Sequence, residues 1–502
     1  MSTTLLVGGR IRASSATAMV VQDGVVVWVG GDEGEARTRF DGADEVFECR
    51  GALVAPAFVD AHVHATSTGL LAGGLDLTGC ASLADCLDTV AGHAAAHPGA
   101  VLWGHGWEET TWPERRPPSR GELDRAARGA AVYLSRIDVH SAAVSSALLE
   151  RTPEAIGADG WAGDGHLSRE AHHSARRAAR ESIGPGQRAG AQLAFLAHAA
   201  AQGVAVVHEC AGPDISGIDD LAGLLALDTG VEVVPYWGQA VTTAAQAAEL
   251  LAATGACGLA GDLFCDGALG SRTAALYEPY ADAPGTCGAA YQDAEAIATH
   301  VVACTRARTQ AGFHVIGDAA TDAVVAGFAA AEAQLGAAAL RASAHRLEHL
   351  EMVSAEQAAQ LARWGVVASV QPAFDAAWGG PDGMYALRLG AERAAAMNPY
   401  AALVGAGVTL AFGSDAPVTP VDPWAAVRAA VSHRTPGARL GEDVAFAAHT
   451  RGGHRAAGVT DPVAGTLVPG APASYAVWDG EGNCLRTVHR GRTLFDRTDA
   501  LR

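Results

Sequence analysis

Lysine is absent from this chain of 502 residues, so all 35 of its basic residues are arginines. A Schiff-base lysine and a phosphate-binding P-loop lysine are therefore excluded. A carbamylated lysine that bridges two metal ions is excluded for the same reason.

Positive charge and long apolar runs are also scarce. Acidic residues number 55, and the net charge is −20. Nucleic acids and anionic membranes bind basic surfaces, so we expect neither as a partner. No apolar run reaches the roughly 18 residues of a membrane span. The N-terminus has no basic segment before a long apolar stretch, so no signal peptide is expected.

The nine cysteines are scattered, and no CxxC pair occurs. An odd number of dispersed cysteines in so long a chain argues against a disulfide framework and favours a reducing compartment. With 49% hydrophobic and 18% charged residues, the chain is typical of a globular protein with a large core. We expect a cytoplasmic protein that acts on a small molecule. The sequence leaves the oligomeric state open, a homo-oligomer included.

Two kinds of pattern divide the chain. Both ends contain short strands with glycine and Asp-Gly turns, so we expect residues 1–55 and 458–502 to form one small β-sandwich domain. Between them, apolar runs alternate with alanine-rich helical segments, which indicates parallel strands with helical crossovers. The predicted fold class is α/β, with a (β/α)8 TIM-type barrel over residues 56–457. The predicted strands lie in the runs at 53–64, 204–209, 231–237, 261–267, 312–318, 345–353, 365–372 and 407–417.

The segment 66–190 is far longer than an ordinary connection between a strand and the next strand of such a barrel. It is rich in Trp, Pro and Arg around 106–124. We predict a lid over the mouth of the barrel. Part of the second barrel strand is expected inside it, at 100–106 or 132–138.

Histidines follow the first predicted strand in the sequence DAHVH at 60–64. His62 and His64 point to the same side of a strand, because side chains alternate with a period of two, and such a pair can chelate a divalent metal. Further polar residues end other apolar runs, where barrel enzymes place their active sites. The predicted ligands of one divalent ion, expected to be Zn²⁺, are His62, His64, His314, His349 and Asp415.

Longer motifs accompany these residues: APAFVDAHVH at 55–64, GWEETTWPERRPPSRGELD at 106–124, RIDVHSAAVSSALL at 136–149, DGALGSRTAALYEPYAD at 266–282, HVIGDAATD at 314–322, RLEHLEMV at 346–353 and GSDAPVTPVDPW at 413–424. In this order the chain resembles the amidohydrolase superfamily, and more narrowly its YtcJ-like (Amidohydrolase 3) branch, which includes N-substituted formamide deformylase. The resemblance implies an enzyme that hydrolyses amide-type carbon–nitrogen bonds, other than peptide bonds, with metal-activated water.

One position departs from the pattern of the family. Many relatives carry a lysine where this chain has Asp262. Asp262 is a candidate extra ligand, but we expect its short side chain not to reach two ions. One tightly held ion is therefore predicted, with a second weak or absent. Glu209 is a further candidate ligand, whereas Cys265 is expected to be a buried structural thiol on the opposite side of its strand.

The expected mechanism assigns Asp415 as the base that takes a proton from water and passes it to the leaving nitrogen. His349 ligates the metal or donates to the developing oxyanion. The resemblance places further residues near the substrate, although each also has an ordinary structural interpretation. These candidates are Trp107 and His140 in the lid, and Asp266 and Arg272 after the fourth strand. Glu108 lies in the same lid, and His172 and His173 are expected on the solvated surface.

Other functions use the same ligand set. Deaminases of this superfamily usually carry an acid three residues after the histidine of strand 5, where this chain has Gly317 followed by Asp318. That disfavours deamination. An ester or lactone hydrolase would need the same residues, so the sequence does not distinguish it from an amide hydrolase. The non-enzymatic alternative is an inactive barrel that serves as a binding protein; the missing lysine favours it and the intact ligand set opposes it.

Overall fold

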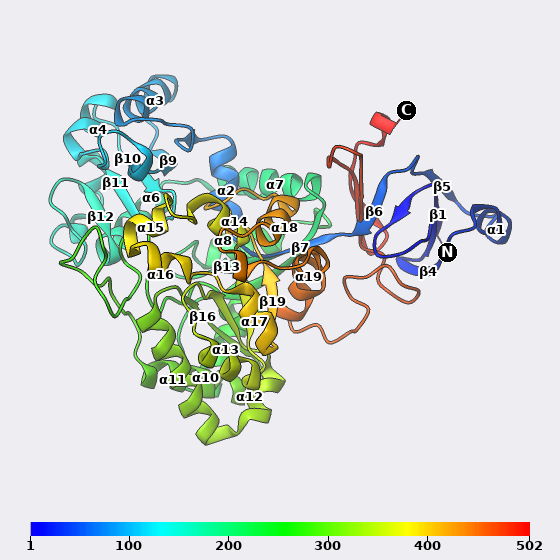
Figure 1. Ribbon diagram of the computed structural model, residues 1–502. Helices are drawn as coiled ribbons and strands as arrows, with labels where there is room; N and C mark the ends of the chain where they lie inside the picture. The colour runs from blue at the N-terminus through cyan, green and yellow to red at the C-terminus, as the bar shows by residue number, and fades with distance from the viewer. Residues whose placement is uncertain (1, 502) are drawn as a thin grey trace.

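A nearly closed barrel of eight parallel strands forms the centre of the molecule (Figure 1). The structure, a computed structural model, describes residues 2–501. Neighbours in the sheet follow the chain order, which confirms the predicted TIM-type α/β fold. The barrel strands are β7 (Phe58–Val63), β13 (Val204–Ala211), β14 (Glu232–Trp237), β15 (Gly258–Leu259), β16 (Gln310–Val315), β17 (Arg346–His349), β18 (Val367–Val370) and β19 (Thr409–Phe412).

The barrel strands read as unbroken apolar runs because helices cover their outer side and side chains fill the interior. All eight residues of β13 are buried. Phe313 of β16 packs on Phe328 of the following helix, with ring centroids 6.5 Å apart. The connections from β7 onward contain α2 (Ala65–Ala72), α7 (Pro185–Ala201), α8 (Ile218–Leu225), α9 (Ala244–Thr254), α10 (Ala294–Arg306), α11 (Asp318–Leu335), α12 (Ala337–Ser343), α13 (Ala355–Trp364), α14 (Pro372–Trp378), α15 (Met384–Leu389), α16 (Ala391–Ala395) and α17 (Tyr400–Ala406). After β19 follow α18 (Pro423–Val431), α19 (Glu442–Ala447) and α20 (Gly453–Ala456).

The first and last strands of the barrel meet at its mouth. The amide of Asp415 donates to the carbonyl of His62 at 2.8 Å, and the amide of His64 donates to the carbonyl of Ala416 at 2.9 Å. A Cβ on Gly413 would lie 2.6 Å from the backbone nitrogen of His62, so only glycine permits this close approach. Residues from opposite ends of the barrel sequence are thereby fixed side by side.

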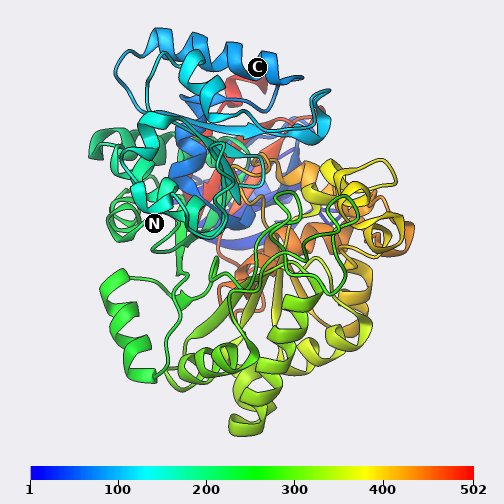
Figure 2. The ribbon, with the colours of Figure 1, turned by 90° about the vertical axis from the view of Figure 1, so that its left-hand side faces the viewer.

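The insertion after β7 forms a sheet of its own. Its strand order is β12-β11-β10-β9-β8, and Figure 2 looks onto it from its own side. The prediction that it contains part of the second barrel strand is wrong, because β13 pairs directly with β7. An apolar run shows that a strand is buried but not which sheet it joins. The elements are β8 (Leu75–Asp76), α3 (Leu83–Ala96), β9 (Leu102–Trp107), α4 (Arg120–Ala126), β10 (Val132–Arg136), β11 (Ser141–Val144), α5 (Ser146–Leu149), β12 (His166–Ser168) and α6 (Arg169–Glu181).

Two further sheets pack together beside the barrel and contain strands from both ends of the chain (Figure 1). Their shared core includes Leu6, Val54 and Val477. In the second sheet β6 pairs antiparallel with β20, so the two terminal segments complete one another. The first sheet has β1 (Thr3–Val7), β3 (Ala18–Gln22), β4 (Val25–Gly30) and β5 (Glu45–Glu48), with α1 (Glu33–Arg39) before β5. The second has β2 (Arg10–Ile11), β6 (Leu53–Pro56), β20 (Tyr475–Trp478), β21 (Cys484–His489) and β22 (Arg492–Asp496).

Within residues 2–501, no single helix has the length and apolar character needed to cross a membrane. Among the described residues, only the sharply bent pair α11 and α12, taken together, is long and apolar enough. The nine cysteines are all free.

Removing residues 465–502 should leave the protein insoluble. The deletion takes away β20 and β21, so β6 loses its partner strand and the ring of Phe58 loses Trp478, whose centroid lies 5.8 Å away. Large apolar surfaces exposed in this way promote aggregation. The soluble fraction after expression measures the effect. A chain that ends at Asp496 keeps β22 and is the control; a soluble, fully active 465–502 deletion would contradict the composite β structure.

Candidate metal centre

Six buried side chains meet where the barrel strands end. His62 lies on β7 and His64 directly after it, while Asp262 follows β15. His314 lies on β16 and His349 ends β17. The sixth is Asp415, which follows β19. The structure thus brings all five predicted ligands together, with Asp262 among them.

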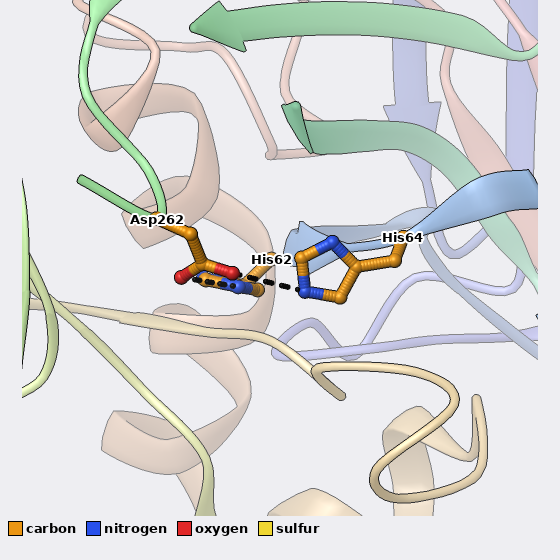
Figure 3. A group of neighbouring side chains, drawn as sticks. All are labelled: His62, His64 and Asp262. Atoms are coloured by element: carbon orange, nitrogen blue, oxygen red, sulfur yellow. Dashed lines mark ion pairs between the residues drawn. The ribbon is translucent and has the colours of Figure 1, made fainter. Parts of the chain in front are cut away.

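The first group surrounds the histidine pair of β7. His62 Nε2 lies 3.5 Å from Asp262 Oδ1 and 3.4 Å from Asp415 Oδ1. His64 Nε2 lies 3.2 Å from Asp262 Oδ2 and 3.2 Å from Asp415 Oδ1. Figure 3 shows both rings turned toward the Asp262 carboxylate. Two ligand atoms about 2.1 Å from one tetrahedral ion are about 3.4 Å apart, so these spacings fit a shared divalent ion.

The second group lies on the other side of Asp262. Its Oδ1 is 3.5 Å from His314 Nδ1 and 3.8 Å from His349 Nε2. Asp262 Oδ1, His314 Nδ1 and His62 Nε2 are all buried without a hydrogen-bond partner. Buried polar atoms without partners are costly in free energy. Metal ions bound by the two groups would satisfy all three atoms, so the residues fit the divalent metal that the sequence predicts.

The expectation that Asp262 is too short to reach both groups is wrong. Strand β15 ends at Leu259, and the parallel pairing with β16 resumes only at Phe264, which forms a bridge with His314. Between them Gly261 has a φ of +80°, in the left-handed region that favours glycine. The backbone itself therefore moves into the mouth of the barrel, and one methylene group suffices.

A second set of contacts orients the histidines. His62 Nδ1 donates to Glu348 Oε2 at 2.9 Å, and Arg346 Nε donates to the other oxygen of that carboxylate at 2.6 Å. His349 Nδ1 donates to Gln371 Oε1 at 2.8 Å. Such contacts fix the ring tautomer and leave Nε2 free for a metal. The sequence analysis did not single out Glu348. Arg346 and Glu348 are two residues apart on one strand, so their side chains lie on the same face.

Two of the candidate ligands have a left-handed backbone conformation. His349 has a φ of +70° and Asp415 a φ of +54°. The left-handed region costs a residue other than glycine about 1–3 kcal/mol and persists where the surroundings impose it, often at functional sites. The amide of Asp415 is held by the His62 carbonyl, which is one such constraint.

The candidate base is held ionised. Burial raises the pKa of Asp415, but the charge of His62 and the hydrogen bond from His64 outweigh burial and hold that pKa below its ordinary value. The same balance of burial against neighbouring histidines lowers the pKa of Asp262. Both carboxylates are therefore in the form that binds cations.

Three nearby candidates have other partners. Glu209 Oε2 accepts from the amide of Ala65 at 2.8 Å and lies outside the ligand groups. Cys265 is buried in the core and also lies outside these groups. Asp266 accepts hydrogen bonds from three backbone amides and does not line the cavity, so the predicted substrate contact is not formed. Its role is to hold the loop after β15 against the start of α11.

Three candidates of the sequence analysis need correction. Trp107 is buried in the core of the insertion, where its Nε1 donates to the Leu134 carbonyl. Arg272 pairs with Asp282 at 2.6 Å and is absent from the cavity wall. His172 is not on the solvated surface: it is buried, and its Nε2 lies 2.8 Å from the Tyr133 hydroxyl. Neither a motif nor a spacing shows which side of an irregular insertion faces inward.

A cavity lies between the metal centre and the insertion. His140 lines it as predicted, with its ring centroid 4.9 Å from that of His314, and burial lowers its pKa well below the usual range. His105 Nε2 lies 3.1 Å from the Pro417 carbonyl and ties the insertion to the loop after β19. Side chains of the insertion that sequence analysis missed also line this cavity: Trp103, His105, Tyr133, Ser135, Val139 and Arg176.

Comparisons with known proteins agree with this site. The chain is 26% identical to the putative amidohydrolase YtcJ of Bacillus subtilis, over 83% of this chain and 80% of that protein. It is 29% identical to the N-substituted formamide deformylase of Arthrobacter pascens, over 30% of this chain and 29% of that one. The crystal structure of an uncharacterized metal-dependent hydrolase from Pyrococcus furiosus matches with a TM-score of 0.72 and 25% identity, covering 95% of this chain and 98% of the other.

The family pattern itself covers nearly the whole chain. Residues 45–498 match the amidohydrolase family, from the start of β5 through the last strand, β22. The barrel, the metal centre and this match together support a metal-dependent hydrolase. The chain belongs to the amidohydrolase family, in its YtcJ-like branch.

Proposed function

We propose that this protein hydrolyses amide-type carbon–nitrogen bonds other than peptide bonds, and that it depends on Zn²⁺ or a similar divalent ion. The observation that carries the proposal is the convergence of four histidines and two aspartates at the strand ends. Imidazole and carboxylate ligands suit zinc. The name of the formamide deformylase, a partial match, supports an amide substrate.

The ligands divide into a tighter and a weaker group. His62, His64, Asp262 and Asp415 would hold one ion with four protein ligands. The other group has two histidines and shares Asp262, so it would hold a second ion more weakly. One tightly held ion, as the sequence predicts, would be bound by the first group, and Asp262 would be a ligand available to both groups. When bound, such an ion lowers the pKa of water toward about 7 and polarises a carbonyl group.

The side chains supply proton transfer and orientation. Asp415, ionised and within 3.4 Å of both β7 histidines, accepts a proton from the attacking water and later gives it to the leaving nitrogen. Gln371 fixes the ring of His349 toward the cavity. His140 is neutral and lines the same cavity, where its ring can bind a polar group of the substrate.

Deamination receives no support from the geometry. The acid nearest to the deaminase position, Asp318, accepts from the amide of Tyr277 at 3.1 Å and does not line the cavity. No contact in the site distinguishes an ester or a lactone from an amide as the substrate. An inactive binding protein would not need a strained, ionised base beside the ligands. A cytoplasmic location and a small-molecule substrate stay predictions, and the oligomeric state stays open.

Asp415→Asn should abolish hydrolysis while the protein stays folded. Proton transfer contributes roughly 100-fold or more to the rate, so kcat should fall at least about that far. N-alkylformamides and N-acetylated amines, compared with matched esters and amino-substituted heterocycles, identify the reaction class by product analysis. Asp318→Asn is the control and should keep full activity. Ammonia release from the heterocycles that depends on Asp318 would contradict the proposal.

Removing the metal and adding Zn²⁺ back should restore activity in two unequal steps. The first equivalent binds tightly, and the second binds the group that shares Asp262. Asp262→Asn should weaken both steps, because its carboxylate contacts both groups. Calorimetric titration with metal analysis measures the stoichiometry. Glu209→Gln is the matched control, and a single equivalent unaffected by Asp262→Asn would refute the shared ligand.

Glu348→Gln should weaken zinc binding by about 10–100-fold, because the carboxylate that orients His62 is lost. Competition with a chelator of known affinity measures the change. Glu232→Gln removes the same kind of contact, a 2.9 Å pair with His489 in the terminal sheets. Zinc affinity should be unchanged in that control. Equal affinities of wild type and Glu348→Gln would show that His62 needs no orienting partner.

A further inference from the structure

One buried arginine lacks the partner that every other buried arginine has. Arginine is almost never buried unless it is paired. Four of the five buried arginines contact carboxylates within 3.0 Å: Arg136, Arg346, Arg388 and Arg486. Arg176, with 7% of its surface exposed, forms no ion pair with any residue in the described range 2–501.

The guanidinium of Arg176 is only partly satisfied. It lies on α6, and its Nη2 donates to the Val139 carbonyl at 2.5 Å and lies 3.5 Å from His172 Nε2. Within the described chain, Nε and Nη1 have no hydrogen-bond acceptor. At least three of its five N–H donors therefore await a partner.

No carboxylate within residues 2–501 forms an ion pair with this cation, although Asp262 and Asp415 line the same cavity. His172 and His173 lie one turn before Arg176 on α6. Burial and the charge of Arg176 lower the pKa of both imidazoles, so both are neutral. Tyr133 of β10 keeps its proton because burial raises its pKa. Asp214, on the loop before α8, pairs with Arg177 at 3.3 Å.

Arg176 lines the cavity that also contains the metal centre. The carbonyl that it contacts belongs to Val139, and the next residue, His140, lies against His314 of the ligand set. A second cavity shares His140 and His314 and is lined by apolar side chains such as Phe374 and Trp378. A substrate bound at the metal centre thus meets a cation on one side and an apolar wall on the other.

We propose that Arg176 binds a carboxylate of the substrate, so that the substrate class is an amide bearing an acid group, such as an N-acyl amino acid. The planar guanidinium presents two parallel N–H groups that match a carboxylate. The inference rests on the proposed function for the identity of the scissile bond. The recognition of the anion depends only on the cavity and on Arg176.

Binding of a matched pair of probes tests the proposal without catalysis. The probes are N-methanesulfonylglycine and its primary amide, whose sulfonamide bond resists hydrolysis. The zinc-loaded full chain should bind the acid at least about tenfold more tightly than the amide. Arg176→Gln should abolish this preference, and Arg176→Lys should keep part of it. Calorimetry measures the four affinities, and metal content and melting temperature establish that each variant is folded and loaded.

Arg177→Gln is the control, because this neighbour on α6 is only half-buried and lies outside the cavity, and the preference should persist. Equal binding of acid and amide by the wild type would overturn the proposal. So would a preference that survives Arg176→Gln, since the metal would then hold the acid group. If Arg176→Gln does not fold, the wild type and Arg176→Lys decide. Absence of amide hydrolysis with an Arg176-dependent preference would refute the proposed function alone.

Discussion

The carboxylate of Asp262 lies between four buried imidazoles, and the arrangement of the strand ends depends on that contact. It is within 3.8 Å of ligand atoms from β7, β16 and β17. Without a cation, these atoms would remain buried with too few partners. The strained backbone at His349 and Asp415 and the interior pair of Arg346 and Glu348 hold the same cluster in place.

The barrel scaffold makes this cluster possible with short side chains. Glycine at position 413 lets β19 approach β7, and the left-handed turn at Gly261 carries Asp262 into the mouth. Asp262 thus reaches the other candidate ligands through the path of the backbone rather than through a long side chain. The insertion then covers the cluster, and its Arg176 lines the same cavity without an ion-pair partner among residues 2–501.

Most of the barrel could be predicted from sequence, and so could most of the side chains that meet at its mouth. The barrel strands end where the apolar runs stop, and His62, His64, His314 and Asp415 lie at those points. The structure of the insertion is harder to predict from sequence. Its strands β9 and β10 look like barrel strands, and Trp107 looks like a substrate contact, yet both belong to a separate sheet and its core. Periodicity reports burial but not the partner that causes it.

The sequence by itself determined the fold class, the ligand types and the exclusion of a lysine carbamate, because these follow from local patterns and composition. Tertiary structure decided which candidate ligands lie within reach of one another and which buried arginine forms no ion pair within residues 2–501. Both depend on distances between residues far apart in the chain, such as Asp262 to His64 and Arg176 to any carboxylate. Such distances arise from barrel closure and from the packing of α6 over the mouth, and no spacing along the sequence encodes them.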